Sequence, residues 1–273
     1  MPDLLAEPES QELAERELGS MSLLQHLEEL RKRIIYSLAA VAICFGVGWW
    51  KADFIYQKMR IPIIKALEDN HWPTQLTYLN PTDPFNNYLK IGLLAGIFIA
   101  SPFLLYQVWG FISPGLYRHE KRFVIPFLFL SVALFLSGGY FGYRVVFPVA
   151  LSFLIQQGGT DLRPMITITE YTNFFLTIIL GLALIFELPI VLGFAGMMGV
   201  VNARFLFKHI RGAVLIFVII AAVLSPTTDV LNLCIYASPM ILLYFMSIGI
   251  VWFVHPGQRR ARREKRDRTA GMN

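Results

Sequence analysis

Long apolar runs alternate with short polar segments from residue 34 to residue 254. Because a helix that crosses a bilayer needs about 20 mostly apolar residues, these runs predict six membrane-spanning helices. The fifth run, with 13 residues, gives only about 20 Å of helix, so we expect a short span there, with the sixth as a second candidate for a short span. The six predicted spans are Ile34–Trp50, Tyr88–Ile112, Phe123–Phe147, Thr172–Val201, Gly212–Leu224 and Val230–Val254.

The composition supports an all-α integral membrane protein. Hydrophobic residues make up 55% of the 273 residues and charged residues 16%, whereas a soluble domain carries about 25% charged residues. Cys44 and Cys234 lie in separate apolar runs, which favours a packing role for both. The sequence contains no phosphate-binding loop, no HExxH or GxSxG motif and no cluster with metal-ligand spacing. We therefore predict no enzymatic activity, catalytic residue, cofactor or metal.

Lysine and arginine residues are unevenly distributed around the predicted spans. Seventeen of the 24 lie in the two tails and in the loops after the second and fourth spans, which share one side of the membrane. Since these residues concentrate on the cytoplasmic side, we expect both termini to be cytoplasmic. Residues 1–21 would form an acidic, disordered tail, 22–254 the membrane domain and 255–273 a basic tail. We interpret the basic tail as a topology anchor beside lipid, with no nucleic-acid partner.

Two stretches on the predicted cytoplasmic side are rich in charged and aromatic residues. In "HLEELRKR", Glu29 and Arg33 are four residues apart and are expected to pair along a helix. In "YQVWGFISPGLYRHEKR", Glu120 is the only acid among several basic residues. Glu29 and Glu120 thus lie on the same side of the membrane. The alternative is that Glu120 only pairs with Lys121 or Arg122.

The stretches "HLEELRKR", "ASPFLLYQVWGFISPGLYRHEKR", "FPVALSFL" and "FELPIVL" resemble the TatC family, the polytopic subunit of the twin-arginine translocase. The likeness runs from about residue 22 to residue 254. It implies a receptor in the cytoplasmic (inner) membrane for signal peptides that carry two consecutive arginines on folded cargo. It also implies assembly with single-span TatA- and TatB-type subunits and with other copies of the chain, and transport driven by the proton-motive force.

The resemblance assigns roles to individual residues. The acidic receptor positions of the family match Glu29 and Glu120, further functional positions match Arg31 and Phe111, and a structural proline of the outer loop matches Pro62. A guanidinium presents a planar fork of donors that a carboxylate accepts with both oxygens, so twin arginines should bind better than twin lysines. The predicted signal-peptide site comprises Glu29, Arg31, Phe111, Leu116, Tyr117, His119 and Glu120.

Glu187 lies in the apolar run "LIFELPIV", near the middle of the fourth predicted span. An ionised carboxylate is costly at that depth, and Pro189 should kink the helix beside it. Three interpretations remain: a neutral, hydrogen-bonded core acid, a relay in a proton-coupled small-molecule transporter, or a contact for the span of a partner subunit. The resemblance favours the third, although the family's glutamine after the turn before span six is replaced by Leu233. The candidate polar residues near that turn are Ser225, Asp229 and Asn232.

Overall fold

The computed structural model describes residues 23–112, 124–157, 164–224 and 230–254. Within these ranges the chain is helical throughout, apart from short connections and one isolated bridge between Thr77 and Thr167. Both predicted tails lie outside the described residues. The elements are α2 (Leu23–Trp50), α3 (Ala52–Asp69), α4 (Asp83–Ile112), α5 (Val124–Phe141), the π-helical turn η3 (Gly142–Val146), α6 (Phe147–Gln157), α7 (Ile168–Ile185), α8 (Leu188–Met197), α9 (Ala203–Lys208), α10 (Ile210–Leu224) and α11 (Val230–Val254).

Five segments of the described chain are long and apolar enough to cross a membrane. They correspond to predicted spans one, two, three, four and six. The predicted fifth span is the shorter apolar helix α10, which has 15 residues. The five segments are Gln25–Trp50, Asp83–Ile112, Ile125–Gln157, Ile168–Met197 and Leu233–Phe253.

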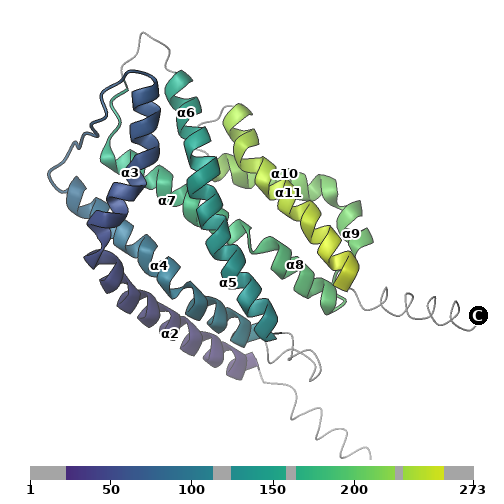
Figure 1. Cartoon of the computed structure of the whole chain (residues 1–273). Coiled ribbons are helices and arrows are strands. Elements are labelled where there is room, and N and C mark those ends of the chain that lie inside the picture. The colour runs from purple at the N-terminus through teal and green to yellow at the C-terminus, as the bar shows by residue number, and fades with distance from the viewer. Residues whose placement is uncertain (1–22, 113–123, 158–163, 225–229, 255–273) are drawn as a thin grey trace, which may run out of the picture.

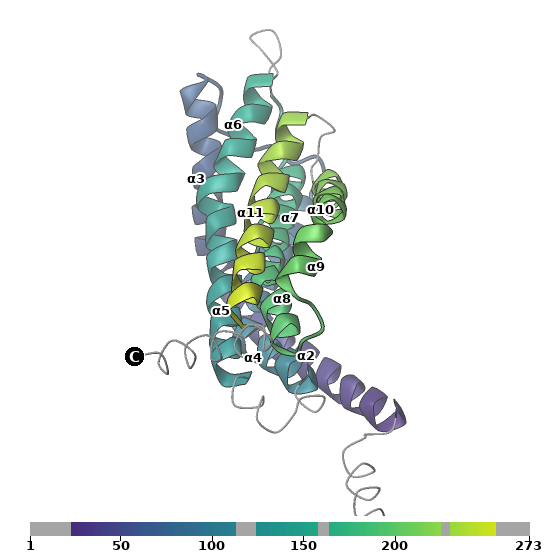
Figure 2. The same ribbon diagram turned by 90° about the vertical axis from the view of Figure 1, so that its right-hand side faces the viewer.

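The third segment is longer than the sequence pattern predicted. We expected it to end at Phe147, but α5, η3 and α6 continue without interruption to Gln157. Pro148 has no backbone N–H, and the turn before it is π-helical, with the Phe147 N–H bonded to the Gly142 carbonyl. The 33 residues span about 50 Å. Since the hydrocarbon layer is about 30 Å thick, α6 extends well beyond it, and α3 packs alongside (Figures 1 and 2).

Pro62 lies inside the 18-residue helix α3 and is buried. A proline cannot donate to the carbonyl four residues earlier, which here belongs to Lys58. The Tyr143 hydroxyl donates to that carbonyl at 2.8 Å. Pro102 and Pro239 free the carbonyls of residues 98 and 235, and each receives a bond from the serine directly before the proline, Ser101 and Ser238. Each of these three prolines therefore comes with a side chain that satisfies the carbonyl it leaves free.

Helix α2 lies at the edge of the bundle, against α4 (Figure 1). Only 6% of the residues in its apolar window are buried. A Cβ atom on Gly96 would lie 2.8 Å from the Phe45 nitrogen, and one on Gly92 would lie 3.2 Å from the Trp49 nitrogen. Small residues at such positions let two helices approach closely in a membrane. The glycines of α4 thus set the distance between α2 and the rest of the molecule.

Candidate functional site

Glu29 and Arg33 form the expected pair along α2, and the pair extends to α4. Arg33 donates through Nε to Glu29 Oε1 at 2.9 Å and through a second nitrogen to the same oxygen at 2.5 Å. Another Arg33 nitrogen donates to the Gln107 side-chain oxygen at 3.2 Å. The two charged side chains are 21% and 23% exposed, so this is not an ordinary surface pair. Arg33 therefore joins α2 to α4 at this end of the molecule.

Within the described residues, one oxygen of the Glu29 carboxylate accepts hydrogen bonds. Its second oxygen, Oε2, is buried and has no hydrogen-bond partner among the described residues. Glu29 also lines a pocket of about 420 Å³ together with Gln25, Glu28 and Lys32. The Glu28–Lys32 pair, by contrast, is more than 60% exposed on both sides. The site thus offers a carboxylate with unused acceptor capacity beside an open pocket.

Aromatic and small residues shape the α4 side of this site. The rings of His26 and Phe111 are stacked, with centroids 4.2 Å apart and an interplanar angle of 18°. A Cβ atom on Gly110 would collide with the Arg33 guanidinium. The absence of a side chain at Gly110 therefore makes room for Arg33. The structure thus brings Phe111 against α2 through His26, a contact that the sequence interpretation did not include.

The other predicted residues of the signal-peptide site divide into two groups. Arg31 is exposed on α2 and has no hydrogen bond or ion pair to Glu29 or to Phe111 in the described chain. The structure therefore does not bring Arg31 together with them. The remaining four predicted residues lie outside the described residues: Leu116, Tyr117, His119 and Glu120.

Glu187 interrupts the fourth apolar segment, as the sequence predicted from Pro189. Helix α7 ends at Ile185 and α8 begins at Leu188, with Glu187 between them. The Ser131 hydroxyl donates to Glu187 Oε2 at 2.8 Å, and the Trp109 indole N–H donates to the Ser131 oxygen at 3.0 Å. This chain of hydrogen bonds joins α4, α5 and the break between α7 and α8. Glu187 Oε1 is buried and has no partner among the described residues.

Apolar side chains surround this hydrogen-bonded chain. Trp109 contacts Phe127 and Phe194, with ring centroids 5.7 Å and 4.9 Å away. Ile190 and Met197 complete the buried cluster. Because few polar groups are nearby to compensate, an unpaired carboxyl oxygen is costly here. The arrangement can hold one further hydrogen-bond donor at Oε1.

The polar residues that were predicted near Glu187 lie at or before the start of α11. Ser225 and Asp229 lie outside the described residues, and Asn232 is the third residue of α11. Leu188 and Leu192 pack against a cluster that contains Met240, Tyr244 and Val251 of α11. Helix α8 therefore packs on the C-terminal part of α11, away from Asn232. Ser131, on a different helix, is the residue that bonds Glu187 in the described chain.

Three polar contacts were missed in the sequence interpretation: those of Gln107, Trp109 and Ser131. Gln107 and Ser131 are isolated polar residues in apolar helices, and that isolation was the available signal. Both are buried. Since a polar side chain inside a membrane protein needs a partner, each could have been marked as a contact point. Which acid each one contacts depends on how the helices pack.

Comparisons with known proteins agree with the resemblance. The family model described as Sec-independent protein translocase protein (TatC) matches residues 25–239. The TatC protein of Koribacter versatilis is 53% identical over 259 residues, 95% of each chain. The TatC protein of Aquifex aeolicus is 38% identical, over 84% of this chain and 93% of that protein.

A solved structure gives the same result for the fold. The crystal structure of the twin-arginine translocase receptor TatC superposes with a TM-score of 0.75 and 36% sequence identity, and the match covers 84% of this chain and 99% of that one. These similarities favour a translocase subunit over a small-molecule transporter that uses Glu187. The chain belongs to the TatC family and is a subunit of the Sec-independent, twin-arginine protein translocase.

Proposed function

We propose that this subunit is the receptor for twin-arginine signal peptides of folded cargo, and that Glu29 accepts one of the two arginines. The observation that carries the proposal is that Glu29 lines an open pocket and that its buried Oε2 has no hydrogen-bond partner in the described chain. A guanidinium can approach that oxygen while Oε1 keeps its bonds to Arg33. Arginine suits this position because its donors are directional and it is more weakly hydrated than an ammonium group.

The second arginine is assigned to Glu120, in the loop that follows α4. The loop starts two residues after Phe111, whose ring is stacked on His26 in α2, next to Glu29. Two carboxylates on separate elements can therefore receive two consecutive guanidinium groups. Leu116, Tyr117 and His119 of the same loop, and Arg31 of α2, complete the proposed site. Phe111 and Tyr117 would supply apolar and cation–π contacts beside the arginines.

The proposed topology has six spans with both termini cytoplasmic, in the cytoplasmic membrane. It counts the short helix α10 as the fifth span. Helix α2 begins and α11 ends toward the same end of the molecule (Figures 1 and 2), which supports an even number of crossings. Most lysine and arginine residues fall on that side as well. Transport in this arrangement draws on the proton-motive force.

Glu187 is proposed to contact a membrane-spanning helix of a TatA- or TatB-type partner subunit. Its unpaired Oε1 supports this role, because a hydroxyl or amide on an incoming helix would satisfy it. The polar residues Ser225, Asp229 and Asn232 are assigned to the same partner contact. Pro62 in α3 has a structural role on the opposite side of the membrane. Other copies of the chain and membrane lipid remain proposed partners.

Binding of signal peptides to the purified subunit tests the receptor proposal. A peptide with two arginines and its counterpart with two lysines are titrated against the wild type, Glu29→Ala and Glu120→Ala. We expect the wild type to prefer the arginine peptide and each variant to lose that preference. Glu28→Ala is the matched control, because Glu28 is on the same helix but pairs with Lys32 at the surface. Equal binding of both peptides by the wild type would refute the proposal.

A further inference from the structure

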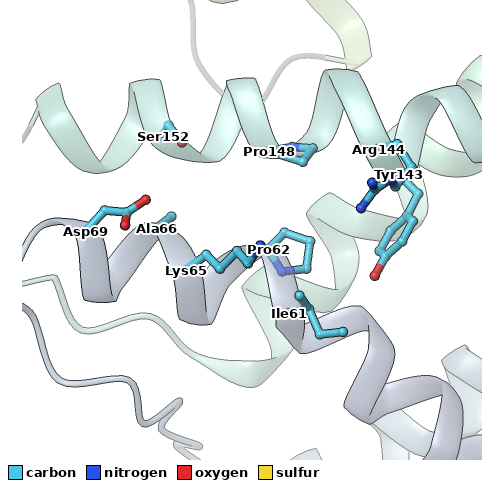
Figure 3. Close-up of a pocket in the computed structure, with 9 residues that line it drawn as sticks. All are labelled: Ile61, Pro62, Lys65, Ala66, Asp69, Tyr143, Arg144, Pro148 and Ser152. Atoms are coloured by element: carbon cyan, nitrogen blue, oxygen red, sulfur yellow. The ribbon is translucent and has the colours of Figure 1, made fainter.

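A pocket of about 310 Å³ lies between α3 and the η3–α6 segment (Figure 3). It is on the opposite side of the molecule from the start of α2 and the end of α11 (Figure 1). Its α3 wall carries Lys65 and Asp69, and the opposite wall carries Arg144 and Ser152. The π-helical turn η3 places Arg144 at one edge of the pocket, and Pro62 lies between the walls (Figure 3). The full lining is Ile61, Pro62, Lys65, Ala66, Asp69, Tyr143, Arg144, Pro148 and Ser152.

The two cations of this pocket have no anionic partner in the described part of the chain. Lys65 and Arg144 are both exposed, and neither forms an ion pair or a side-chain hydrogen bond with a described residue. Asp69, one helical turn after Lys65, is not within ion-pair distance of it. The pocket therefore carries a net charge of about +1 and has unused donors on two facing walls, which suits an anion of moderate size.

The position of Arg144 places the pocket at the level of lipid headgroups. Arg144 is 19 residues beyond Ile125, the start of the third spanning segment, which corresponds to about 29 Å of helix. That length matches the hydrocarbon layer of about 30 Å. Beside the cations, Ile61, Val145 and Val149 expose apolar side chains. A lipid can thus keep its acyl chains against this apolar surface while its headgroup enters the pocket.

We propose that the pocket binds the headgroup of an anionic phospholipid of the phosphatidylglycerol type. Lys65 and Arg144 hold the phosphate from opposite sides. Asp69 and Ser152 accept hydrogen bonds from the hydroxyl groups of the glycerol, which gives the acid in this pocket a function. A choline headgroup lacks these hydroxyls and brings a positive charge toward the two cations. This lipid site is separate from the signal-peptide site, and a failure of either proposal would not refute the other.

Native mass spectrometry of the purified full chain, titrated with phosphatidylglycerol or phosphatidylcholine, tests the site. We expect Lys65→Gln and Arg144→Gln each to weaken phosphatidylglycerol binding about fivefold, the effect of one basic residue near an anionic headgroup. The double variant should bind phosphatidylglycerol about 25-fold more weakly than the wild type, the product of the two single effects. Its binding of phosphatidylcholine should not change. The control is Lys51→Gln with Lys58→Gln, which removes two cations from the same outer region without touching the pocket. The rescue variant Lys65→Arg with Arg144→Lys should retain the affinity.

Thermal unfolding checks that the double variant is folded: phosphatidylglycerol should raise the midpoint for the wild type and the control, and much less for the variant. The proposal would be overturned if the double variant and the control lost phosphatidylglycerol affinity equally. It would also be overturned if the double variant bound this lipid as tightly as the wild type. Inorganic phosphate and glycerol 1-phosphate form a further arm. If either competes at the concentration at which the lipid binds, the pocket takes a free phosphate and the lipid assignment is wrong.

Discussion

Glu29 and Glu187 are two half-occupied carboxylates that are held by different kinds of partner. Glu29 accepts two bonds from a guanidinium on its own helix, at the edge of the bundle and beside an open pocket. Glu187 accepts one bond from a hydroxyl that is itself bonded by an indole, among aromatic rings. Each keeps one buried oxygen without a partner in the described chain.

The difference indicates what each site can receive. A carboxylate that accepts from one guanidinium through a single oxygen, beside an open pocket, can accept a second guanidinium through its other oxygen. A carboxyl group surrounded by apolar side chains gains most from a single neutral donor, because a further charge would have to leave water. The first site therefore suits a charged peptide that arrives from solution. The second suits a helix that arrives through the membrane.

The largest expected effect on export comes from exchanging the acid for its amide at Glu29. The same exchange at Glu187 is the comparison. Glu29→Gln keeps the shape but removes the charge, so we expect export of twin-arginine cargo to fall at least tenfold. Glu187→Gln keeps a hydrogen-bond acceptor and should retain most of the export. Export assays in cells that lack their own TatC measure both. If Glu187→Gln loses as much export as Glu29→Gln does, the contrast between the two sites is wrong.

Glu187→Ala removes the acceptor altogether, and its effect should fall on assembly. We expect signal-peptide binding within about twofold of the wild type, with weaker coupling to the partner subunits. Cysteine crosslinks between the fourth spanning segment and the partner's spanning helix report that coupling directly. Crosslinks that are unchanged by the substitution would contradict the assignment of Glu187 to partner contact.

Gly96→Ala should disturb Glu29 without disturbing Glu187. The new Cβ would lie 2.8 Å from the Phe45 backbone nitrogen, so α2 must move away from α4. We expect a loss of about 1–3 kcal/mol in stability and a weaker contact between Arg33 and Gln107. Unfolding in mild detergent measures the stability. Gly46→Ala on α2 is the control, since a Cβ there meets nothing within 4 Å; equal losses in both variants would refute the packing argument.

Ser131→Ala removes both the bond from Ser131 to Glu187 and the bond from Trp109 to Ser131. It leaves the Trp109 indole N–H and Glu187 Oε2 without these partners. The free energy of unfolding should fall by about 1 kcal/mol. Ser137→Ala is the matched control on α5, because in the described chain that hydroxyl donates to the Leu134 carbonyl of its own helix. The same unfolding assay compares them. A stable Ser131→Ala variant with unchanged tryptophan fluorescence would show that the chain of bonds contributes little.

The smallest effect is expected for Glu28→Ala. Its pair with Lys32 is exposed on both sides, and surface pairs of this kind contribute little. Export and stability should both match the wild type, although Glu28 is the direct neighbour of Glu29. A clear loss of export would show that the pocket lined by Glu28 and Glu29 binds through its total charge, and the specific role of Glu29 would fail.

Sequence periodicity predicted the helices well because spanning segments must be long, apolar and internally hydrogen-bonded. The break at Glu187 followed from Pro189, and the Glu29–Arg33 pair followed from helical spacing. The third segment was predicted to end at Phe147, whereas a π-helical turn accommodates Pro148 and the helix continues to Gln157. The partner of Glu187 was also missed. Ser131 is 56 positions away, and only the packing of α5 against the break brings the two together.

The bridge between Thr77 and Thr167 has a consequence for amide exchange. Thr77 N–H donates to the Ile166 carbonyl at 3.1 Å, and Ile168 N–H donates to the Thr77 carbonyl at 2.8 Å. These two amides lie 91 positions apart, one in the α3–α4 connection and the other at the first residue of α7, yet one separation of the two segments exposes both. They should exchange with solvent deuterium at matching rates, slower than their neighbours in the same connections. A single pair of amides thus reports whether the α3–α4 and α6–α7 connections move as one body.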